Sequence, residues 1–206
     1  MKKILLSLFA LLASFEVSNA QVSGMNIGYC HGKLGPFPST SDTYFSDLST
    51  KKKTWTSGAI LIKKEKINSL AGNQIREIHA GLISKLNVDS LAVWVSESLD
   101  GPILSTDTIA TPAKGWNTVA LTKPVDITSD MQTLYVGYSY HQKSTSKAMS
   151  CTKTPEPGYS CFIRSGNDEW KDYSNYYTVS VEAMVYGDKL PKYDLTLSAL
   201  DVQQNY

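Results

Sequence analysis

Histidine and cysteine are both scarce in this chain, with three residues of each among 206. The histidines stand far apart, and no Cys-x-x-Cys pair occurs, so neither a histidine-rich metal site nor a structural zinc site is expected. The spaced Asp-x-Asp-x-Asp loop of a calcium site is also missing. We therefore expect no cofactor, although turn carboxylates such as Asp168, Glu169 and Asp172 could still hold calcium.

An excess of charge of one sign is also missing. The chain has 20 lysines and arginines against 19 aspartates and glutamates, for a formal net charge of +1. Nucleic-acid binding calls for a clustered basic face. The basic cluster of the chain, Lys51–Lys53 with Lys63, Lys64 and Lys66 close behind, is typical of solvated loop and helix-face charges. No nucleic-acid partner is therefore expected.

Long apolar runs are missing beyond the first twenty residues. Basic Met1–Lys3, apolar Ile4–Ala13 and the small-residue site Ser18–Ala20 together predict a signal peptide over residues 1–20. The apolar run is well short of the roughly 20 residues that span a bilayer, so no membrane span is expected once the signal is removed. The mature chain should begin at Gln21 and be exported to the periplasm, the cell surface or the extracellular space.

Helical periodicity is missing from most of the remaining chain, and strand alternation takes its place. Between Ser90 and Ser96, Val93 and Val95 lie on one side and Trp94 on the other, which is the period of a pleated strand. About nine such runs, with at most one short helix at 64–70, predict an all-β fold: an antiparallel two-sheet sandwich of jelly-roll type. Common parity within the runs predicts a shared core of Val93, Val95, Val119, Leu121, Val136, Val179 and Val181.

The domain boundary is predicted near residue 188. Residues 21–188 are expected to form the sandwich domain, because a charged hinge containing Pro191 follows the last clear strand. The segment Tyr193–Leu200 is typical of another strand, so residues 189–206 are interpreted as a linker and the first strand of a truncated second domain. In the alternative, this strand folds back as an edge of the first sandwich or adds to a partner.

The cysteines, at positions 30, 151 and 161, are an odd number for an exported protein. Cys151 and Cys161 flank the turn signal at 155–158, so we predict a hairpin with arms at 148–152 and 159–164 and a disulfide across it. Closing that short loop would contribute about 3 kcal/mol in the chain-entropy model. Cys30 is expected to stay free or buried, and the alternative to the disulfide is two or three buried free thiols.

Five stretches of structural residues follow one another in a recognisable order: residues 70–75, 93–95, 115–119 and 134–138, and then a tryptophan loop before a valine-rich strand. This succession resembles a jelly-roll accessory module of secreted and surface proteins of the Bacteroidetes. Such modules occur beside streptopain-like cysteine proteases and are similar in plan to the adhesin domains of gingipains. The resemblance covers roughly residues 25–188. It implies an accessory, binding or adhesive role, carries over no catalytic residue, and implies an immunoglobulin-like identity for the truncated second domain.

Aromatic residues interleaved with carboxylates suggest where a ligand could bind. Trp170, Tyr173 and Tyr176 stand among acidic residues, and sugars are bound by aromatic faces flanked by polar groups. In the alternative, Trp170 caps the core and the tyrosines are strand-entry residues. Trp94 is expected either on an exposed concave sheet face or beneath a loop. These four residues form the predicted ligand site, for an extracellular glycan or protein.

No catalytic group is predicted. Cys30 and His31 are adjacent in sequence, but a catalytic pair must be adjacent in space with a third group that orients the base. Paired carboxylates such as Glu97 with Asp100 are read as solvated turn residues rather than glycosidase acids. The sequence therefore predicts a non-catalytic extracellular module for adhesion, binding or an accessory role. The alternatives are an ancillary region of a secreted cysteine peptidase and a structural spacer.

Overall fold

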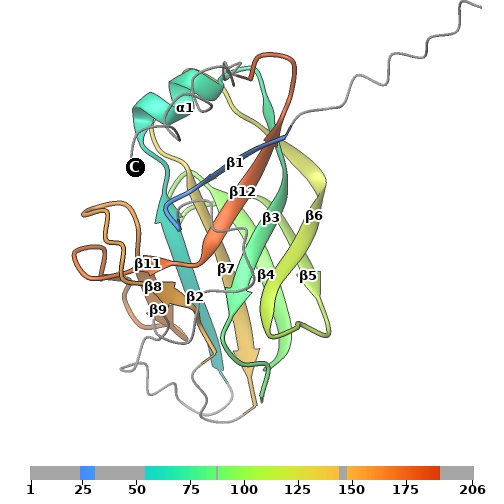
Figure 1. Ribbon diagram of the computed structural model, residues 1–206, viewed down its shortest axis with the longest axis vertical. Helices are drawn as coiled ribbons and strands as arrows, with labels where there is room; N and C mark the ends of the chain where they lie inside the picture. Colours follow the sequence, from blue (N-terminus) through green and yellow to red (C-terminus); the bar gives the residue numbers. More distant parts are fainter. Residues whose placement is uncertain (1–23, 31–53, 87, 144–147, 191–206) are drawn as a thin grey trace, which may run out of the picture.

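The computed structural model describes residues 24–30, 54–86, 88–143 and 148–190. This part of the chain forms an antiparallel β-sandwich of two main sheets and one short helix, as the sequence predicts (Figure 1). The predicted signal peptide, residues 1–20, and the predicted strand at 193–200 lie outside the described residues. No helix in the described part has the length and apolarity needed to cross a membrane.

The smaller sheet has four strands, and the first and last described strands lie side by side in it (Figure 1). Its spatial order is β1 (Gly24–Gly28), β12 (Val181–Tyr186), β3 (Gln74–Leu82) and β6 (Gly115–Asp126). Along β3, Ile78 and Ala80 are buried in the core while Glu77 and His79 point away from it, as the two-residue period of a strand requires.

The larger sheet has six strands. Its spatial order is β10 (Lys171–Asp172), β9 (Phe162–Ser165), β2 (Thr54–Leu61), β7 (Tyr135–Gln142), β4 (Val88–Ser96) and β5 (Ile103–Ile109). A separate two-stranded ribbon joins β8 (Cys151–Thr152) to β11 (Thr178–Val179). Among the described strands, β5 and β10 are the edges of this sheet.

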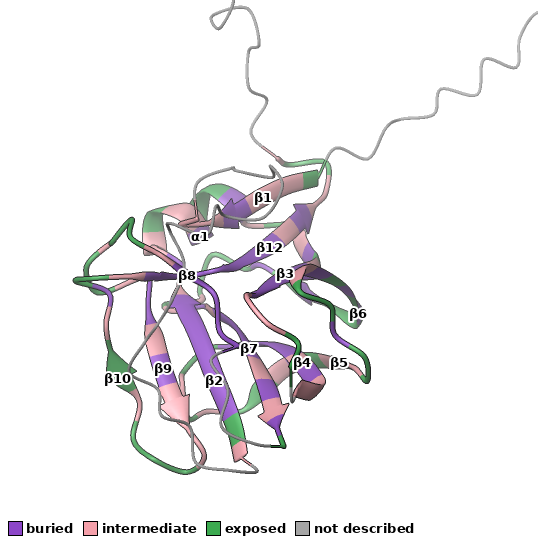
Figure 2. Cartoon of the chain, turned by 60° about the horizontal axis from the view of Figure 1, so that its bottom comes forward, coloured by how far each residue is buried: buried purple, intermediate pink, exposed green. Residues whose placement is uncertain are grey.

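The hydrophobic core fills the space between the two sheets. All seven residues predicted to share it belong to one buried cluster, so the parity assigned from the alternating runs is confirmed. In the larger sheet, Val93 and Val95 of β4 face the core and Trp94 lies on the opposite side, while β2 is buried along most of its length (Figure 2). The residues between the buried positions of the larger sheet therefore point to its other side, which we call the outer face.

The short helix α1 (Lys64–Leu70) packs on one end of the sandwich. Ile67 and Leu70 are three residues apart and therefore lie on the same face of the helix, and both are buried. Gly72 has φ +84°, the left-handed conformation that ends many helices and that glycine adopts without strain. Its N–H donates to the Ile127 carbonyl, so the helix end is tied to the chain beyond β6.

The predicted hairpin of 148–152 and 159–164 is wrong. β8 pairs with β11, and β9 pairs with β2 and β10 instead. The turn between them is real, but it is held by Ser160, whose Oγ accepts from the Glu156 N–H and donates to the Tyr177 carbonyl. Val179 of β11 pairs with Cys151 and donates its N–H to the Ser160 carbonyl at 2.9 Å, so β11 lies between the two predicted arms and β9 joins the six-stranded sheet.

Candidate functional site

A pocket of about 210 Å³ lies on the outer face of the six-stranded sheet. Strands β2, β4, β7 and β9 supply its floor, and the loops at 97–102 and 166–170 supply its rim. The pocket is smaller than the sites that take drug-sized ligands, so it suits a ligand the size of a single ring. Its lining consists of Ser57, Trp94, Ser96, Leu99, Asp100, Gly101, Ile103, Ser139, Arg164 and Trp170.

Trp94 lies in the floor of the pocket, on the side of β4 opposite Val93 and Val95, with only 7% of its surface exposed. Across the sheet it faces Gly137 of β7. A Cβ at Gly137 would lie 2.7 Å from the Cε2 atom of the Trp94 indole, closer than real contacts allow. The glycine therefore lets the indole lie against the backbone of β7, which fixes the ring.

A pair of hydroxyls holds the polar edge of the same indole. Trp94 Nε1 donates a hydrogen bond of 3.1 Å to Ser139 Oγ, and that oxygen lies 2.7 Å from Ser57 Oγ. Ser57 and Ser139 are directly opposite on β2 and β7, so the register of the two strands sets this contact. The floor of the pocket is thus an aromatic ring bordered by fixed hydroxyl groups.

Trp170 forms the wall above this floor. Its ring centroid lies 6.0 Å from that of Trp94, in an edge-to-face arrangement. The guanidinium carbon of Arg164 lies 4.6 Å from the Trp170 centroid, within the range of a cation–π contact. Asp100 joins the two, because its Oδ1 accepts from Arg164 Nη1 at 2.7 Å and from Trp170 Nε1 at 3.1 Å.

These two charged groups keep unused hydrogen-bonding capacity. Arg164 Nε is buried and has no hydrogen-bond partner, although a buried donor without a partner is costly. The Asp100 side chain is 74% exposed, and both of its hydrogen bonds within the described chain use the same oxygen. The pocket therefore offers a ligand an acceptor at Asp100, beside the 30% exposed side chain of Arg164.

The lining of the pocket contains one carboxylate and one guanidinium. Asp100 and Arg164 are the ionisable residues among those that line the pocket, and each is engaged with the other. Glycoside hydrolysis normally needs two carboxylates that flank the scissile bond, and this pocket has one. Glu97, considered as the partner of Asp100 from sequence, is exposed and is absent from the lining.

Two of the four predicted ligand-binding residues come together in this pocket, and two do not. Trp94 and Trp170 line it, but Tyr173 packs against the hydrophobic core and Tyr176 is 66% exposed beside Tyr177. Tyr173 and Tyr176 are close to Trp170 in the sequence but do not line the pocket with it, because the chain turns after β10 toward the two-stranded ribbon. Arg164 and Ser139 lie on other strands, and no local sequence pattern marks them as part of the site.

The cysteines lie away from the pocket, and all three are free thiols in the structure. Cys151 and Cys161 are both buried, and hydrogen bonding between the two side chains, together with burial, raises the pKa of the Cys151 thiol. They therefore lie side by side even though the hairpin expected to join them does not form. The disulfide between them stays a prediction for the oxidised protein.

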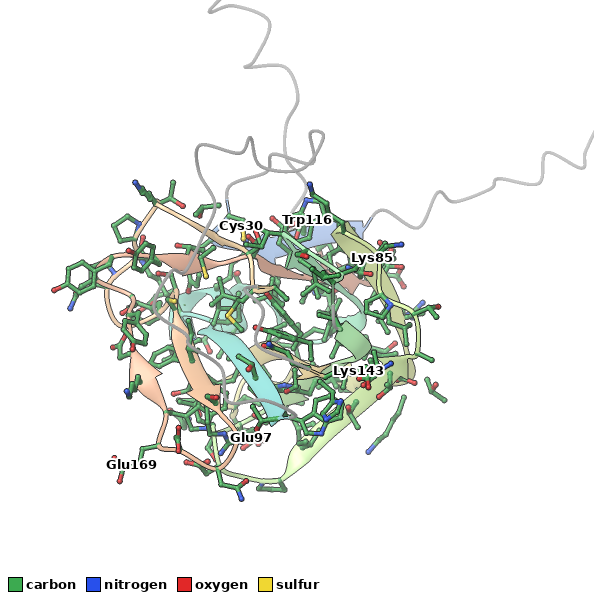
Figure 3. The ribbon with its side chains drawn as sticks, turned by 90° about the horizontal axis from the view of Figure 1, so that it is seen from below. Cys30, Lys85, Glu97, Trp116, Lys143 and Glu169 are labelled. Atoms are coloured by element: carbon green, nitrogen blue, oxygen red, sulfur yellow. The ribbon has the colours of Figure 1, made fainter. Side chains whose placement is uncertain are left out.

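Cys30 has the opposite environment to a catalytic nucleophile. Burial raises the pKa of its thiol, and the nearby Glu182 carboxylate raises it further. Its sulfur donates to the Val179 carbonyl at 3.2 Å. Figure 3 shows Cys30 on the side of the molecule away from Glu97 and Glu169, which belong to the two loops of the pocket rim.

Among the described residues, no group of three or more histidines, cysteines or carboxylates is arranged to hold a metal ion. A scan against models of protein families finds no match, and a search of curated proteins finds none either. The resemblance to jelly-roll accessory modules therefore stays a hypothesis based on short sequence motifs.

Proposed function

We propose that this chain is an exported, non-catalytic β-sandwich module that binds a glycan in the outer-face pocket. The observation that carries the proposal is the meeting of Trp94 and Trp170 with the Arg164–Asp100 pair in one small cavity. An aromatic surface can take the apolar C–H face of a sugar ring, and fixed polar groups beside it can orient the hydroxyls.

The donors and acceptors of the pocket match the hydroxyl groups of a sugar. A hydroxyl both donates and accepts, so one sugar can accept from the guanidinium of Arg164, whose side chain is 30% exposed, and donate to Asp100. The side chains are also held in place before a ligand arrives, since Trp94 is fixed by Gly137 and Ser139. Such preorganisation reduces the entropy lost on binding.

Other ligand classes fit this pocket less well. A ligand cation would meet the guanidinium of Arg164, which already lies over the Trp170 ring. A peptide that binds by strand addition needs an open sheet edge, whereas the pocket lies on the face of the central strands β2, β7 and β4. The signal peptide and the resemblance to secreted accessory modules support the extracellular setting in which a glycan-binding module acts.

A glycan array with matched variants tests the proposal. We expect the wild-type protein to bind a restricted set of glycans, and Trp170→Ala and Arg164→Gln each to lose that binding while the melting temperature stays within a few degrees. Tyr176→Ala is the control, because this aromatic residue is exposed but lies outside the pocket. An empty array, or binding that survives Trp170→Ala, would contradict the proposal and leave the spacer role as the better explanation.

A further inference from the structure

A second aromatic pair lies on the same outer face, beyond the rim of the pocket. Trp55, near the start of β2, is 42% exposed, although the rest of the strand is largely buried (Figure 2). It stands directly opposite His141 on β7, and the two ring centroids are 5.4 Å apart. A large exposed indole backed by a second ring is a surface that a ligand can cover.

The ring of His141 is held in position from its other side. Its Nδ1 lies 2.8 Å from Asp89 Oδ1, and Lys143 Nζ lies 3.9 Å from the second oxygen of the same carboxylate. On the other flank of Trp55, β9 ends and Gly166 donates its N–H to the Trp55 carbonyl at 2.7 Å. Gly166 carries no side chain, so this neighbour does not cover the indole.

The strand register places this pair in line with the pocket. Ser57 and Ser139, in the pocket lining, are two residues farther along the same strands and on the same face as Trp55 and His141. Two residues of an antiparallel strand span about 7 Å. An aromatic surface is therefore followed, at a distance comparable to the size of one sugar unit, by a hydroxyl pair and then by the Trp94–Trp170 pocket.

We propose that Trp55 and His141 form a second subsite, so that the protein binds an extended glycan laid along β2 and β7 rather than a single terminal sugar. This inference rests on the proposed function of the pocket. It adds that the ligand is an oligosaccharide or polysaccharide, that one unit occupies the pocket, and that a more distant unit stacks on Trp55.

The charges along this path favour a neutral chain. Asp89 is engaged by His141 and Lys143, and Asp100 is engaged by Arg164. Neither end of the path therefore presents an excess of one sign to the ligand. The groups between the two ends are serine hydroxyls, which suit the hydroxyls of a neutral polysaccharide.

A chain-length series tests the second subsite. Calorimetry would use the monosaccharide, the disaccharide and longer oligomers of the gluco-, manno-, xylo- and galacto-series, chosen by the array. For wild type we expect affinity to rise with length until both subsites are filled. Trp55→Ala should weaken only the longer oligomers, by about fivefold or more, and leave the shortest bound ligand unaffected. Trp55→Tyr should restore much of the gain, since it keeps an aromatic face.

The outcomes separate the two proposals. If wild type binds and Trp170→Ala abolishes binding, but Trp55→Ala lowers all lengths equally or none, the second subsite is wrong and the pocket stands. If no glycan of any length binds, the proposed function fails, and the subsite fails with it. Binding of unglycosylated peptides through Trp55 would overturn the glycan assignment of this face. Thermal melts of each variant show whether a loss of affinity reflects unfolding, and Tyr176→Ala again serves as the control.

Discussion

Trp94 and Gly137 face each other across β4 and β7, and the indole occupies the space that any side chain at position 137 would fill. This relationship links sheet packing to the pocket. The glycine determines the depth at which the indole lies, and the indole in turn sets the floor on which Trp170 packs.

Gly137→Ala should therefore disturb both stability and the pocket. Overpacking of this kind costs about 1–3 kcal/mol, because Trp94 is nearly buried and cannot swing freely away. We expect a lower melting temperature and an altered near-ultraviolet circular dichroism signal from the tryptophans. Gly158→Ala is the control, since no atom lies within 4 Å of a Cβ there and the cost is confined to the backbone at φ +78°. A Gly137→Ala variant that keeps the parental melt and spectrum would show that the indole is not so confined.

Val95→Asp should destabilise the sandwich by at least about 3 kcal/mol, because it would bury an unpaired carboxylate. Val95 is fully buried between the sheets. Thr108→Asp, at an exposed position of the edge strand β5, is the matched control and should change little. Denaturant titration compares the two, and similar midpoints for both variants would be inconsistent with the core described above.

Stability should depend on pH through Asp89. Its hydrogen bond with His141, followed by the charges of His141 and Lys143, holds the pKa of this carboxyl below its ordinary value of 3.8. A group with a lowered pKa stabilises the fold above its ordinary pKa, and that contribution is lost as pH falls through the lowered value. Asp89→Asn should thus destabilise the protein at neutral pH and match the parent in strong acid. Equal differences at both pH values would rule out this linkage.

The thiols should behave differently in the folded and unfolded protein. Because the pKa of the Cys151 thiol is raised, a thiol reagent should react very slowly at neutral pH with the reduced folded protein. After folding under oxidising conditions, we expect one reactive thiol per denatured chain, that of Cys30, because Cys151 and Cys161 lie side by side. Cys30→Ser should then show none. Three thiols under the same conditions would mean that the predicted disulfide does not form.

Two truncations should locate the end of the first domain. The N–H of Lys189 donates to the buried Asn73 Oδ1 at 3.0 Å, and Leu190 packs against the core. Ending the chain after Asp188 should lower the melting temperature by a few degrees, because the buried amide loses a partner worth about 1 kcal/mol. Ending it after Leu190 should leave the melt unchanged. A large drop for the longer version would instead place residues beyond 190 in the first domain's sheet.

Most of the fold could be predicted from the sequence, because strands with one buried face alternate apolar and polar residues with a period of two. The run Ser90–Ser96 alternates, and its faces were assigned correctly, with Val93 and Val95 in the core and Trp94 on the opposite side. β5 carries little apolar alternation, since it is an edge strand with few buried residues, so its sequence is a weak strand signal. Pairing was harder to predict than strand location: the hairpin at Cys151 was wrong because Val179, far along the chain, pairs with Cys151 and donates to the Ser160 carbonyl, which places β11 between the two arms.

Only half of the candidate site could be predicted from the sequence. Trp94 and Trp170 stand out as tryptophans, but what joins them is the order of strands in the sheet, which brings Arg164 of β9 and Ser139 of β7 to the same face. Asp100 has the appearance of an ordinary turn carboxylate in the sequence. Its role follows from contacts with residues 164 and 170, more than sixty positions away, which no local pattern encodes.

The position of β12 between β1 and β3 also constrains the order in which the molecule can be made. β1 is the first of the described strands to be synthesised, yet it pairs with β12, the last of them. A nascent chain that ends before Val181 would therefore leave β1 unpaired and one edge of β3 open, and open edges are where chains join one another. The four-stranded sheet becomes complete only when residue 186 has left the ribosome, so folding is postponed until nearly the whole described chain exists.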